Sequence, residues 1–267
     1  YQGGIPIFAD IDPRTYNIDP IEIQKKITTK TKAIIPVDFT GQPVELDEIM
    51  ELAKENNLIV IEDAAHAIGA TYKNKKIGSI ADMTMFSFHP VKHITTGEGG
   101  IITTNKKYLY EKLLQFRTHG ITRNPILLSK VDGPWYYEMQ FLGYNYRMTD
   151  IQAALGISQM NKLDKFIERR KTIVQQYNNA FASLKEIVTP YQHSNGESSW
   201  HLYVVQLNSE LLSIDRKEFF IKLRQANIGV NVHYIPVHLQ PFYKNQFGYK
   251  EGDFPIAENL YNRIITL

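Results

Sequence analysis

Residues 58–64 read LIVIEDA, and residues 83–89 read MTMFSFH. Each run is apolar until its end, where polar side chains appear, and each is short enough to be a single buried strand. KAIIPVDF at 32–39 and GIITT at 100–104 have the same character. Strands that are almost wholly apolar are typical of a parallel sheet with both faces covered. These four stretches therefore predict the centre of the fold.

Helix-like segments alternate with these strands. VELDEIMELAKENN at 44–57 has apolar residues at helical spacing, and DPIEIQKKI at 19–27 starts with Asp19 as an N-cap and Pro20 at the first helical position. IPIFADI at 5–11 is predicted to be a further strand. The alternation of strand and helix predicts an α/β fold, with a mostly parallel sheet and helices on both faces.

The second half of the chain is organised differently. Between residues 148 and 184, apolar side chains recur three, four or seven residues apart, as on one face of a long helix. YVVQL at 203–207, DRKEFFIKLRQANI at 215–228 and VNVHYIP at 230–236 then read as strand, helix and strand. The predicted division is a large α/β domain over 1–147, a long connecting helix over 148–186 and a smaller α+β domain over 187–267.

The composition narrows the classes of function. The 267 residues are 43% hydrophobic and 22% charged, and the formal net charge is +2. A charge so close to balance gives no argument for a nucleic acid or a membrane surface as partner. The chain has no cysteine, which excludes disulfides, thiolate catalysis and cysteine-ligated metals. No apolar run approaches the length of a membrane span, and we expect a cytoplasmic location.

Asp63 lies just past a strongly apolar strand. A carboxylate in that position is costly unless it meets a cation or hydrogen-bond donors. Open α/β sheets deliver functional residues at the carboxyl ends of their strands, which makes Asp63 a candidate site residue. It also precedes a segment of small residues, so it could be the N-cap of a helix. The residue pattern alone favours the interpretation of Asp63 as an N-cap.

A second strand end leads into MFSFHPVKHITTGEGG at 85–100. A lone lysine is usually a solvated surface charge, but Lys92 follows a sheet strand among small and polar residues. Loss of water and nearby positive charge would lower its pKa and free the amine to form a Schiff base. His89 and His93 could supply such surroundings. With Pro90 between them these histidines show no helical spacing, so we do not expect a metal ion.

Pyridoxal 5′-phosphate (PLP) would account for both strand ends. PLP needs a lysine for its aldehyde, a carboxylate near its pyridine nitrogen and donors for its phosphate. Lys92, Asp63 and Ser87 are predicted to fill these roles. A nicotinamide dehydrogenase would need a GxGxxG fingerprint, which GEGG at 97–100 does not match, and the GxxxxGK[ST] phosphate loop is absent as well.

Three blocks resemble a known family. They begin EDAAHAIGATYK at 62, LGYNYRMTDIQAALG at 142 and VNVHYIPVHLQPFY at 230, and they are similar to the DegT/DnrJ-type nucleotide-sugar aminotransferases, which are PLP enzymes of fold type I. The resemblance implies that Lys92 is the Schiff-base lysine and that Asp63 is the partner of the pyridine nitrogen. It implies four more cofactor contacts: Ala65 on the ring face, His66 at the ring hydroxyl, Ser87 at the phosphate, and Asn145 at the phosphate of the other subunit.

The same resemblance implies an activity. The expected reaction converts a UDP-linked 4-keto-6-deoxy sugar to the 4-amino sugar, as in a pathway of the pseudaminic acid type, with glutamate as amino donor and a homodimer that shares its active sites. A family dehydratase is one alternative, although these typically have histidine at the position of Lys92. A cofactor-binding remnant without activity is another.

Two departures from the family pattern stand out. The family carries a Gly-Thr phosphate loop and a ring-stacking aromatic residue upstream of the segment that begins this chain. We therefore expect the protein to continue beyond both ends of the chain. His93 stands where members often have proline.

Overall fold

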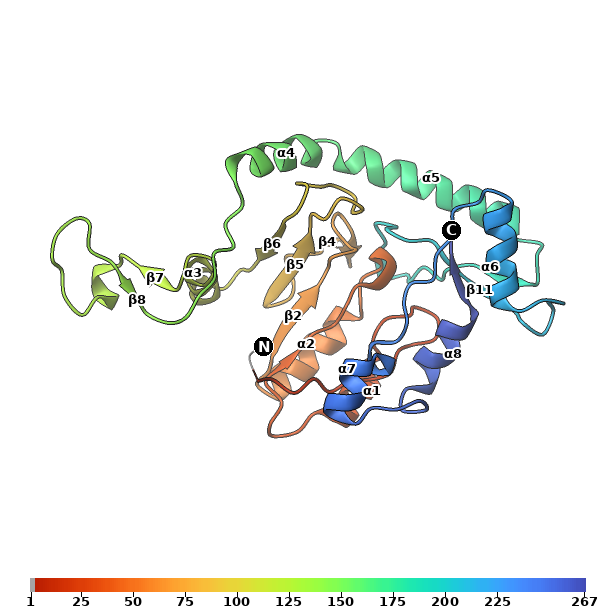
Figure 1. The fold of residues 1–267 in the computed structure, drawn as a ribbon, viewed down its shortest axis with the longest axis horizontal. Helices are drawn as coiled ribbons and strands as arrows, with labels where there is room; N and C mark the ends of the chain where they lie inside the picture. The colour runs from red at the N-terminus through yellow and green to blue at the C-terminus, as the bar shows by residue number, and fades with distance from the viewer. Residues whose placement is uncertain (1–2) are drawn as a thin grey trace.

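The computed structural model describes residues 3–267, so the first two residues of the predicted large domain lie outside it. A four-stranded sheet lies at its centre (Figure 1). Three neighbouring strands are parallel and the fourth is antiparallel at the edge, which agrees with a mostly parallel sheet. In spatial order the strands are β1 (Ala33–Ile34), β2 (Ile59–Asp63), β5 (Met83–Ser87) and β6 (Gly100–Thr103).

The helices α1 (Pro20–Lys26) and α2 (Leu46–Glu55) follow the expected pattern. Asp19 is the N-cap of α1, and its carboxylate accepts the Ile21 N–H at 2.8 Å. The inner face of α2 packs into the same core as the sheet, where each fully buried aliphatic side chain contributes about 1.5–3 kcal/mol. The buried residues of α2 are Leu46, Ile49 and Ala53.

The stretch predicted as one long helix consists of two, α4 (Asp150–Met160) and α5 (Leu163–Phe181). At the junction the Lys162 N–H bonds to the Gln159 carbonyl at 2.9 Å, a three-residue spacing that ends α4. α5 then runs along one side of the molecule (Figure 1) and contributes to two cores. Its first half buries Leu163 and Ile167 with the central sheet, and its second half packs Val174, Tyr177 and Phe181 with the C-terminal strands.

The C-terminal region contains a three-stranded antiparallel sheet, in the order β12 (Ile264–Thr266), β11 (Val204–Leu207) and β9 (Ile187–Val188). Every residue of β11 is buried, and α6 (Arg216–Gln225) follows as the sequence predicts. The strand expected at 230–236 is reduced to a single bridge between Asn231 and Thr266.

The strand expected at 5–11 is also absent, and only Ile11 forms a bridge, with Ile18. Ile5 and Ile7 are 73% and 62% exposed. An apolar run becomes a strand only where a neighbouring backbone is available to pair with it. Among the described residues no such partner lies beside Ile5 or Ile7, which explains the difference.

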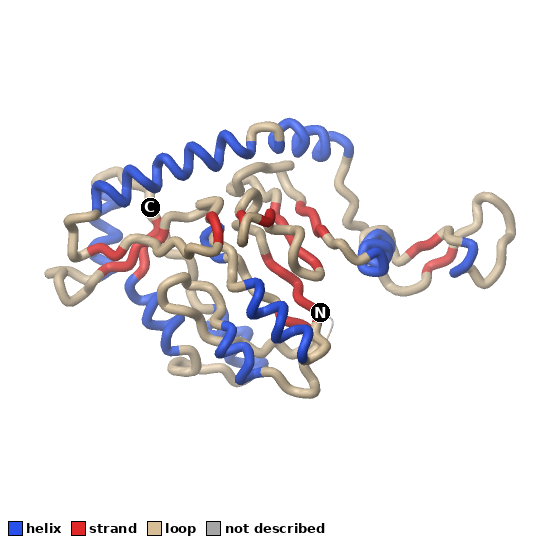
Figure 2. The backbone as a smooth tube through the Cα atoms, turned by 180° about the vertical axis from the view of Figure 1, so that it is seen from behind, coloured by secondary structure: helices blue, strands red, loops and turns tan. Residues whose placement is uncertain are grey.

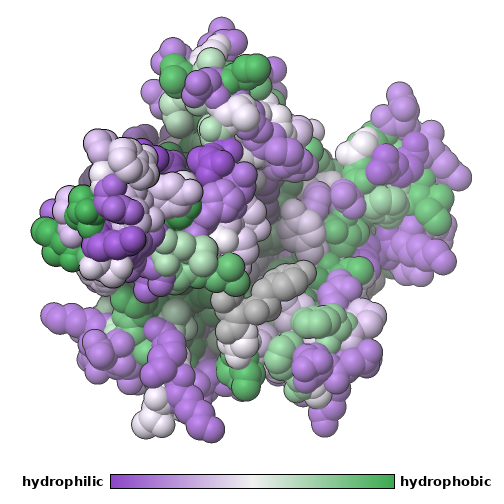
Figure 3. Space-filling view, turned by 60° about the vertical axis from the view of Figure 1, so that its left-hand side comes forward, coloured by the Kyte–Doolittle hydropathy of each residue, from purple (hydrophilic) through white to green (hydrophobic). Residues whose placement is uncertain are grey.

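An arm projects from the body between α3 (Lys107–Phe116) and α4, and Figures 1 and 2 show it from opposite sides. Its short hairpin pairs β7 (Ile121–Thr122) with β8 (Glu138–Met139). Several large apolar side chains of the arm are exposed, among them Ile126 and Trp135. The space-filling view in Figure 3 shows such hydrophobic residues scattered among hydrophilic ones on the projecting parts of the molecule.

None of the helices within residues 3–267 is long and apolar enough to cross a membrane.

Short elements complete the described chain. The remaining elements are β3 (Thr71–Tyr72), β4 (Lys75–Lys76) and β10 (Gly196–Glu197), which form a small antiparallel sheet, the helices α7 (Pro241–Phe247) and α8 (Pro255–Arg263), and three 3₁₀ turns, η1 (Phe39–Gly41), η2 (Pro125–Leu127) and η3 (Val237–Leu239).

Candidate active site

The two predicted strand ends meet at one edge of the sheet. Asp63 is the last residue of β2, and Ser87 is the last residue of β5, the parallel neighbour of β2. Lys92 lies five residues beyond Ser87 in a tight turn, in which the Lys92 N–H bonds to the His89 carbonyl at 3.0 Å. Parallel pairing places both carboxyl ends on the same side, so the lysine and the aspartate face one site.

The amine of Lys92 is in a mixed environment. Partial burial lowers its pKa, because water that would stabilise the ammonium is displaced, and the Asp63 carboxylate opposes this by attracting the positive charge. The two side chains therefore interact electrostatically. Half-burial and a lowered pKa are the properties expected of a lysine that must lose its proton to act as a nucleophile.

The structure shows that the N-cap interpretation of Asp63 is wrong. Residues 64–69 form turns rather than a helix. The Asp63 Oδ1 accepts the Ala65 N–H at 3.1 Å. The Asp63 N–H donates to the Pro36 carbonyl at 2.8 Å, and the Asp63 carbonyl accepts the Asp38 N–H at 3.0 Å. The carboxylate is therefore oriented by a local turn, and it keeps capacity to accept further hydrogen bonds from a ligand.

His66 is buried beside this pair. Burial lowers the pKa of its imidazole to about 3, with Lys92 and two other histidines contributing in the same direction. The ring is therefore neutral at physiological pH. Its Nδ1 atom is buried and has no hydrogen-bond partner among residues 3–267. A buried polar atom without a partner is unusual, so the Nδ1 atom of His66 is available to a ligand at this edge of the sheet.

Several aromatic side chains from later in the chain lie beside His66, and the sequence predicted no role for them. The His201 ring lies 4.4 Å from that of His66, and the Tyr234 ring lies 6.3 Å from it. Burial and the charge of Lys92 lower the pKa of His233. The only sequence signal for His233 and Tyr234 was the block at 230–243, whose resemblance carried no residue roles.

The remaining predicted residues differ in their positions. The Ser87 Oγ accepts the His89 N–H at 3.3 Å, and Ala65 is half-buried in the turn that follows Asp63. Asn145 is exposed on the arm, where it forms a bridge with Thr118. The structure therefore brings Ala65 and Ser87 to the edge that carries Asp63, and it leaves Asn145 outside that group.

The two histidines that flank Lys92 point to different partners. His89 is exposed and lies 3.9 Å from the Glu98 carboxylate. His93 is buried, and its Nε2 bonds to the Ser199 carbonyl at 2.9 Å. Burial lowers the pKa of His93 to about 4. His93 therefore adds a neutral, hydrogen-bonded ring and no fixed charge to the surroundings of the lysine.

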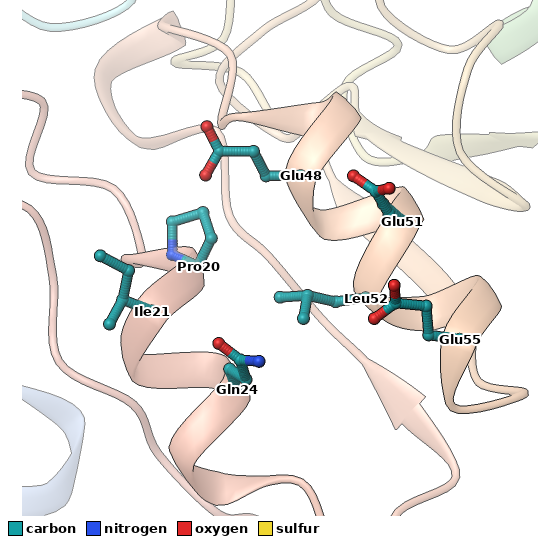
Figure 4. Close-up of a pocket in the computed structure, with 7 residues that line it drawn as sticks. All are labelled: Pro20, Ile21, Gln24, Glu48, Glu51, Leu52 and Glu55. Carbon is teal, nitrogen blue, oxygen red and sulfur yellow. The ribbon is translucent and has the colours of Figure 1, made fainter.

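Two surface grooves lie elsewhere. The larger, about 360 Å³, is between α1 and α2 (Figure 4), and a second of about 290 Å³ adjoins it near Arg14 and His193. Neither groove is lined by Lys92 or Asp63. The larger groove is acidic, which offers nothing to a phosphate-bearing ligand, and its lining residues are Pro20, Ile21, Gln24, Glu48, Glu51, Leu52 and Glu55.

Known proteins are similar to this chain in sequence and in fold. The chain is 44% identical over its whole length to the spore coat polysaccharide biosynthesis protein SpsC of Bacillus subtilis, of which it covers 69%. Over 94% of its length it is 41% identical to the UDP-4-amino-4,6-dideoxy-N-acetyl-beta-L-altrosamine transaminase of Campylobacter jejuni serotype O:23/36, and it covers 65% of that protein. The GDP-perosamine synthase of Caulobacter vibrioides is 40% identical over 97% of the chain, which covers 66% of it.

Solved structures agree. The Helicobacter pylori aminotransferase PseC, described as involved in pseudoaminic acid biosynthesis, superimposes with a TM-score of 0.90 at 33% identity, over 99% of this chain and 68% of that one. The PLP form of the putative sugar aminotransferase Spr1654 from Streptococcus pneumoniae superimposes with a TM-score of 0.87 at 33% identity, over 99% of this chain and 70% of that one. These neighbours confirm the predicted fold and are consistent with the predicted cofactor.

All residues of the chain, 1–267, match the profile of one family. The match agrees with the resemblance seen in the three sequence blocks and with the meeting of Lys92 and Asp63 at the carboxyl edge of the sheet. The chain belongs to the DegT/DnrJ/EryC1/StrS aminotransferase family.

Proposed function

We propose that the protein transfers an amino group from glutamate to the 4-keto carbon of a UDP-linked 6-deoxy sugar, with PLP as cofactor. The observation that carries the proposal is the electrostatic interaction of a half-buried Lys92, in the loop after β5, with the Asp63 carboxylate at the end of the parallel neighbour β2. The chain spans about two thirds of the length of its curated relatives, so the activity proposed is that of the whole protein.

The residues present fit PLP. Lys92 would hold the cofactor covalently, and Asp63 would meet its pyridine nitrogen. The unpartnered, buried Nδ1 of His66 is available for the ring hydroxyl. Ala65, in the turn after Asp63, would pack on the ring face, and the Ser87 hydroxyl would contact the phosphate. When bound, PLP supplies an electron sink for the carbon that gains or loses the amino group.

The protein's own groups would then control protons and orientation. The Lys92 amine, with its lowered pKa, is suited to take up a proton at one carbon and return it at another. The Asp63 carboxylate, fixed by its turn, would keep the pyridine nitrogen protonated. His66 stays neutral and can donate or accept a hydrogen bond without adding charge.

We propose that the second subunit of a homodimer completes the site. Asn145 is exposed on the projecting arm rather than near Lys92 of its own chain, which is the placement expected of a residue that serves a neighbour. In this arrangement residues 1–147 form the cofactor domain, 148–186 the connecting helical segment and 187–267 the smaller domain.

The choice of sugar rests on similarity. The transaminase from Campylobacter acts on a UDP-sugar by its name, and the relative from Caulobacter is named for a GDP-sugar, at nearly equal identities of 41% and 40%. The sequence block around Lys92 favours a UDP-linked sugar as the substrate. A dehydratase is disfavoured because Lys92 is a lysine and not a histidine.

The test replaces Lys92 in the full-length protein by Ala and by Arg, with Lys107→Ala as the matched control because Lys107 is exposed on α3. The variants are incubated with PLP, glutamate and either a UDP-linked or a GDP-linked 4-keto-6-deoxy sugar. Both Lys92 variants should lose the visible absorption of lysine-linked PLP and all amination. The control should keep both.

Three results would contradict the proposal. Amination by either Lys92 variant would remove the lysine from the mechanism. Amination of the GDP-sugar alone would refute the choice of nucleotide, and water elimination without amination would support the dehydratase.

A further inference from the structure

One short segment of the C-terminal half crosses the candidate site. Residues 198–201, SSWH, follow the small sheet that contains β10, and Ser199 is completely buried. The Ser199 N–H bonds to the Gly41 carbonyl at 3.0 Å, and the His201 N–H bonds to the Thr40 carbonyl at 2.8 Å. Gly41 has a φ of +102°, and a Cβ there would lie 2.8 Å from the Ser199 Oγ and 2.8 Å from the His66 carbonyl oxygen. The segment is therefore in close contact with the 3₁₀ turn η1.

Ser199 joins the two loops that carry the proposed cofactor residues. Its hydroxyl donates to the His66 carbonyl at 2.9 Å, in the turn after β2. Its own carbonyl accepts the Nε2–H of His93 at 2.9 Å, in the loop after β5. The second bond fixes the tautomer of His93, because a carbonyl can only accept. His93 is the neighbour of Lys92, so a single buried serine connects the turn of His66 with the loop of the lysine.

His201 adds a ring to the same connection. Its imidazole lies between two others, 4.4 Å from the ring of His66 and 5.3 Å from the ring of His93. Burial lowers its pKa to about 2, so all three rings are neutral and pack without mutual repulsion. A ring in that place limits the orientations open to His66.

The segment is held from the opposite side by α5. The Arg170 Nη1 donates to the Trp200 carbonyl at 3.0 Å and to the His201 carbonyl at 3.2 Å. Bonds from a charged donor are stronger than neutral ones, and Arg170 comes from the long helix that packs in both cores. The position of residues 198–201 is therefore fixed by hydrogen bonds to both η1 and α5.

We infer that Ser199 and His201 are positioning residues of the active site: they hold His66 and the loop of Lys92 in the geometry that binds the cofactor. The inference rests on the proposed PLP function for its consequence, although the contacts themselves do not depend on it. The segment lies in the predicted smaller domain, so that domain would help to assemble the cofactor site of the larger one.

The test uses two variants with matched controls in the full-length protein. Ser199→Ala removes the hydroxyl and is compared with Ser79→Ala, whose hydroxyl also donates to a backbone carbonyl, that of Lys76. His201→Phe keeps a ring without nitrogens and is compared with His238→Phe, which removes another buried ring nitrogen.

Three measurements are made on each variant. Hydrogen exchange without PLP reports on residues 64–69 and 88–96. PLP affinity and the pH at which the absorption band of lysine-linked PLP titrates report on the assembled site.

We expect Ser199→Ala, which loses the bond to the His66 carbonyl and keeps the backbone carbonyl that accepts from His93, to exchange faster in residues 64–69 and to bind PLP about three- to tenfold more weakly, the range for one buried hydrogen bond. His201→Phe should shift the pH at which the band titrates. The controls should match the wild type in hydrogen exchange, PLP affinity and band titration, even if His238→Phe lowers the melting temperature.

Wild-type exchange of residues 64–69 in Ser199→Ala would overturn the role of Ser199, and a wild-type band titration in His201→Phe would overturn the role of His201. If Ser199→Ala does not fold, the band titration of His201→Phe decides the inference. Failure of the wild-type protein to bind PLP at Lys92 would refute the proposed function instead, and the exchange data would still decide the positioning role.

Discussion

Asp38 and Glu62 bring two carboxyl groups together in the interior, with no surface of either residue exposed. The Asp38 Oδ1 accepts the Val44 N–H at 3.0 Å, and the Glu62 Oε2 accepts the Thr84 hydroxyl at 2.6 Å. The remaining oxygens, Asp38 Oδ2 and Glu62 Oε1, are buried without a partner among the described residues, and each carboxyl group influences the pKa of the other. We infer that the two carboxyl groups share one proton, which would satisfy both oxygens.

This pair makes stability depend on pH. Burial raises the pKa of both carboxyls, and the charges of Glu62 and Asp63 raise that of Asp38 further, while Val44, Thr84 and the backbone of Gly78 act in the opposite direction. The folded state therefore keeps a proton that the unfolded chain releases near pH 4. The stabilisation is fully present below that pH and is lost as the pH rises through the folded pKa.

Asp38→Asn should flatten this dependence, because the amide can donate to Glu62 without a titrating proton. The slope of the unfolding free energy against pH, above about pH 4, should change by up to about 1.4 kcal/mol per pH unit. Urea unfolding at a series of pH values measures it. Asp47→Asn is the control, since Asp47 is exposed in an ion pair with Lys73. Equal slopes in wild type and Asp38→Asn would show that no proton is shared.

Asp63→Ala should lose amination by on the order of 100-fold, the loss typical of a group that stabilises developing charge. The fold should survive, because the removed carboxylate makes one local bond to the Ala65 N–H and begins no helix. Asp63→Glu should retain part of the activity, since it keeps the charge but displaces it. Steady-state rates and a thermal melt are the measurements. A variant that unfolds while its folded fraction keeps full activity would assign Asp63 a purely structural role.

Two inactive variants should restore each other if Asn145 serves the neighbouring subunit. Lys92→Ala and Asn145→Asp are mixed, dissociated and reassociated, so that some sites combine an intact Lys92 with an intact Asn145 from the partner. Such a site would lie at the interface of a symmetric dimer. Activity should partly return in the mixture. No recovery, despite demonstrated subunit exchange, would mean that Asn145 acts in its own subunit.

Gly120→Ala should loosen the base of the arm. Gly120 has a φ of +69°, and a Cβ there would lie 1.8 Å from the Phe141 carbonyl oxygen. Gly248→Ala is the control, because Gly248 has a φ of +76° but open space around it. The control should lose about 1 kcal/mol of unfolding free energy from backbone strain, and Gly120→Ala should lose at least about 2 kcal/mol more. Chemical denaturation compares them, and equal losses would show that the contact with Phe141 relaxes freely.

The sequence was informative where local chemistry dictates structure. The apolar side chains at 58–64 and 83–89 are shielded from water inside a covered sheet, where these runs form β2 and β5. The cap formed by Asp19 followed from its side-chain oxygen and the proline after it. The family, its fold and its cofactor were recognisable from the blocks around Lys92, because residues that contact a cofactor are constrained one by one.

The tertiary structure decided what depends on distant partners. The runs at 5–11 and 230–236 have the composition of strands, but strand formation needs a neighbouring backbone, and the described chain provides only single bridges there. The meeting of Ser199 with His66 and His93 joins segments more than one hundred residues apart. No local pattern encodes such a contact, because it is fixed by the packing of α5 and the C-terminal strands, which bring residues 198–201 to the edge where β2 and β5 end.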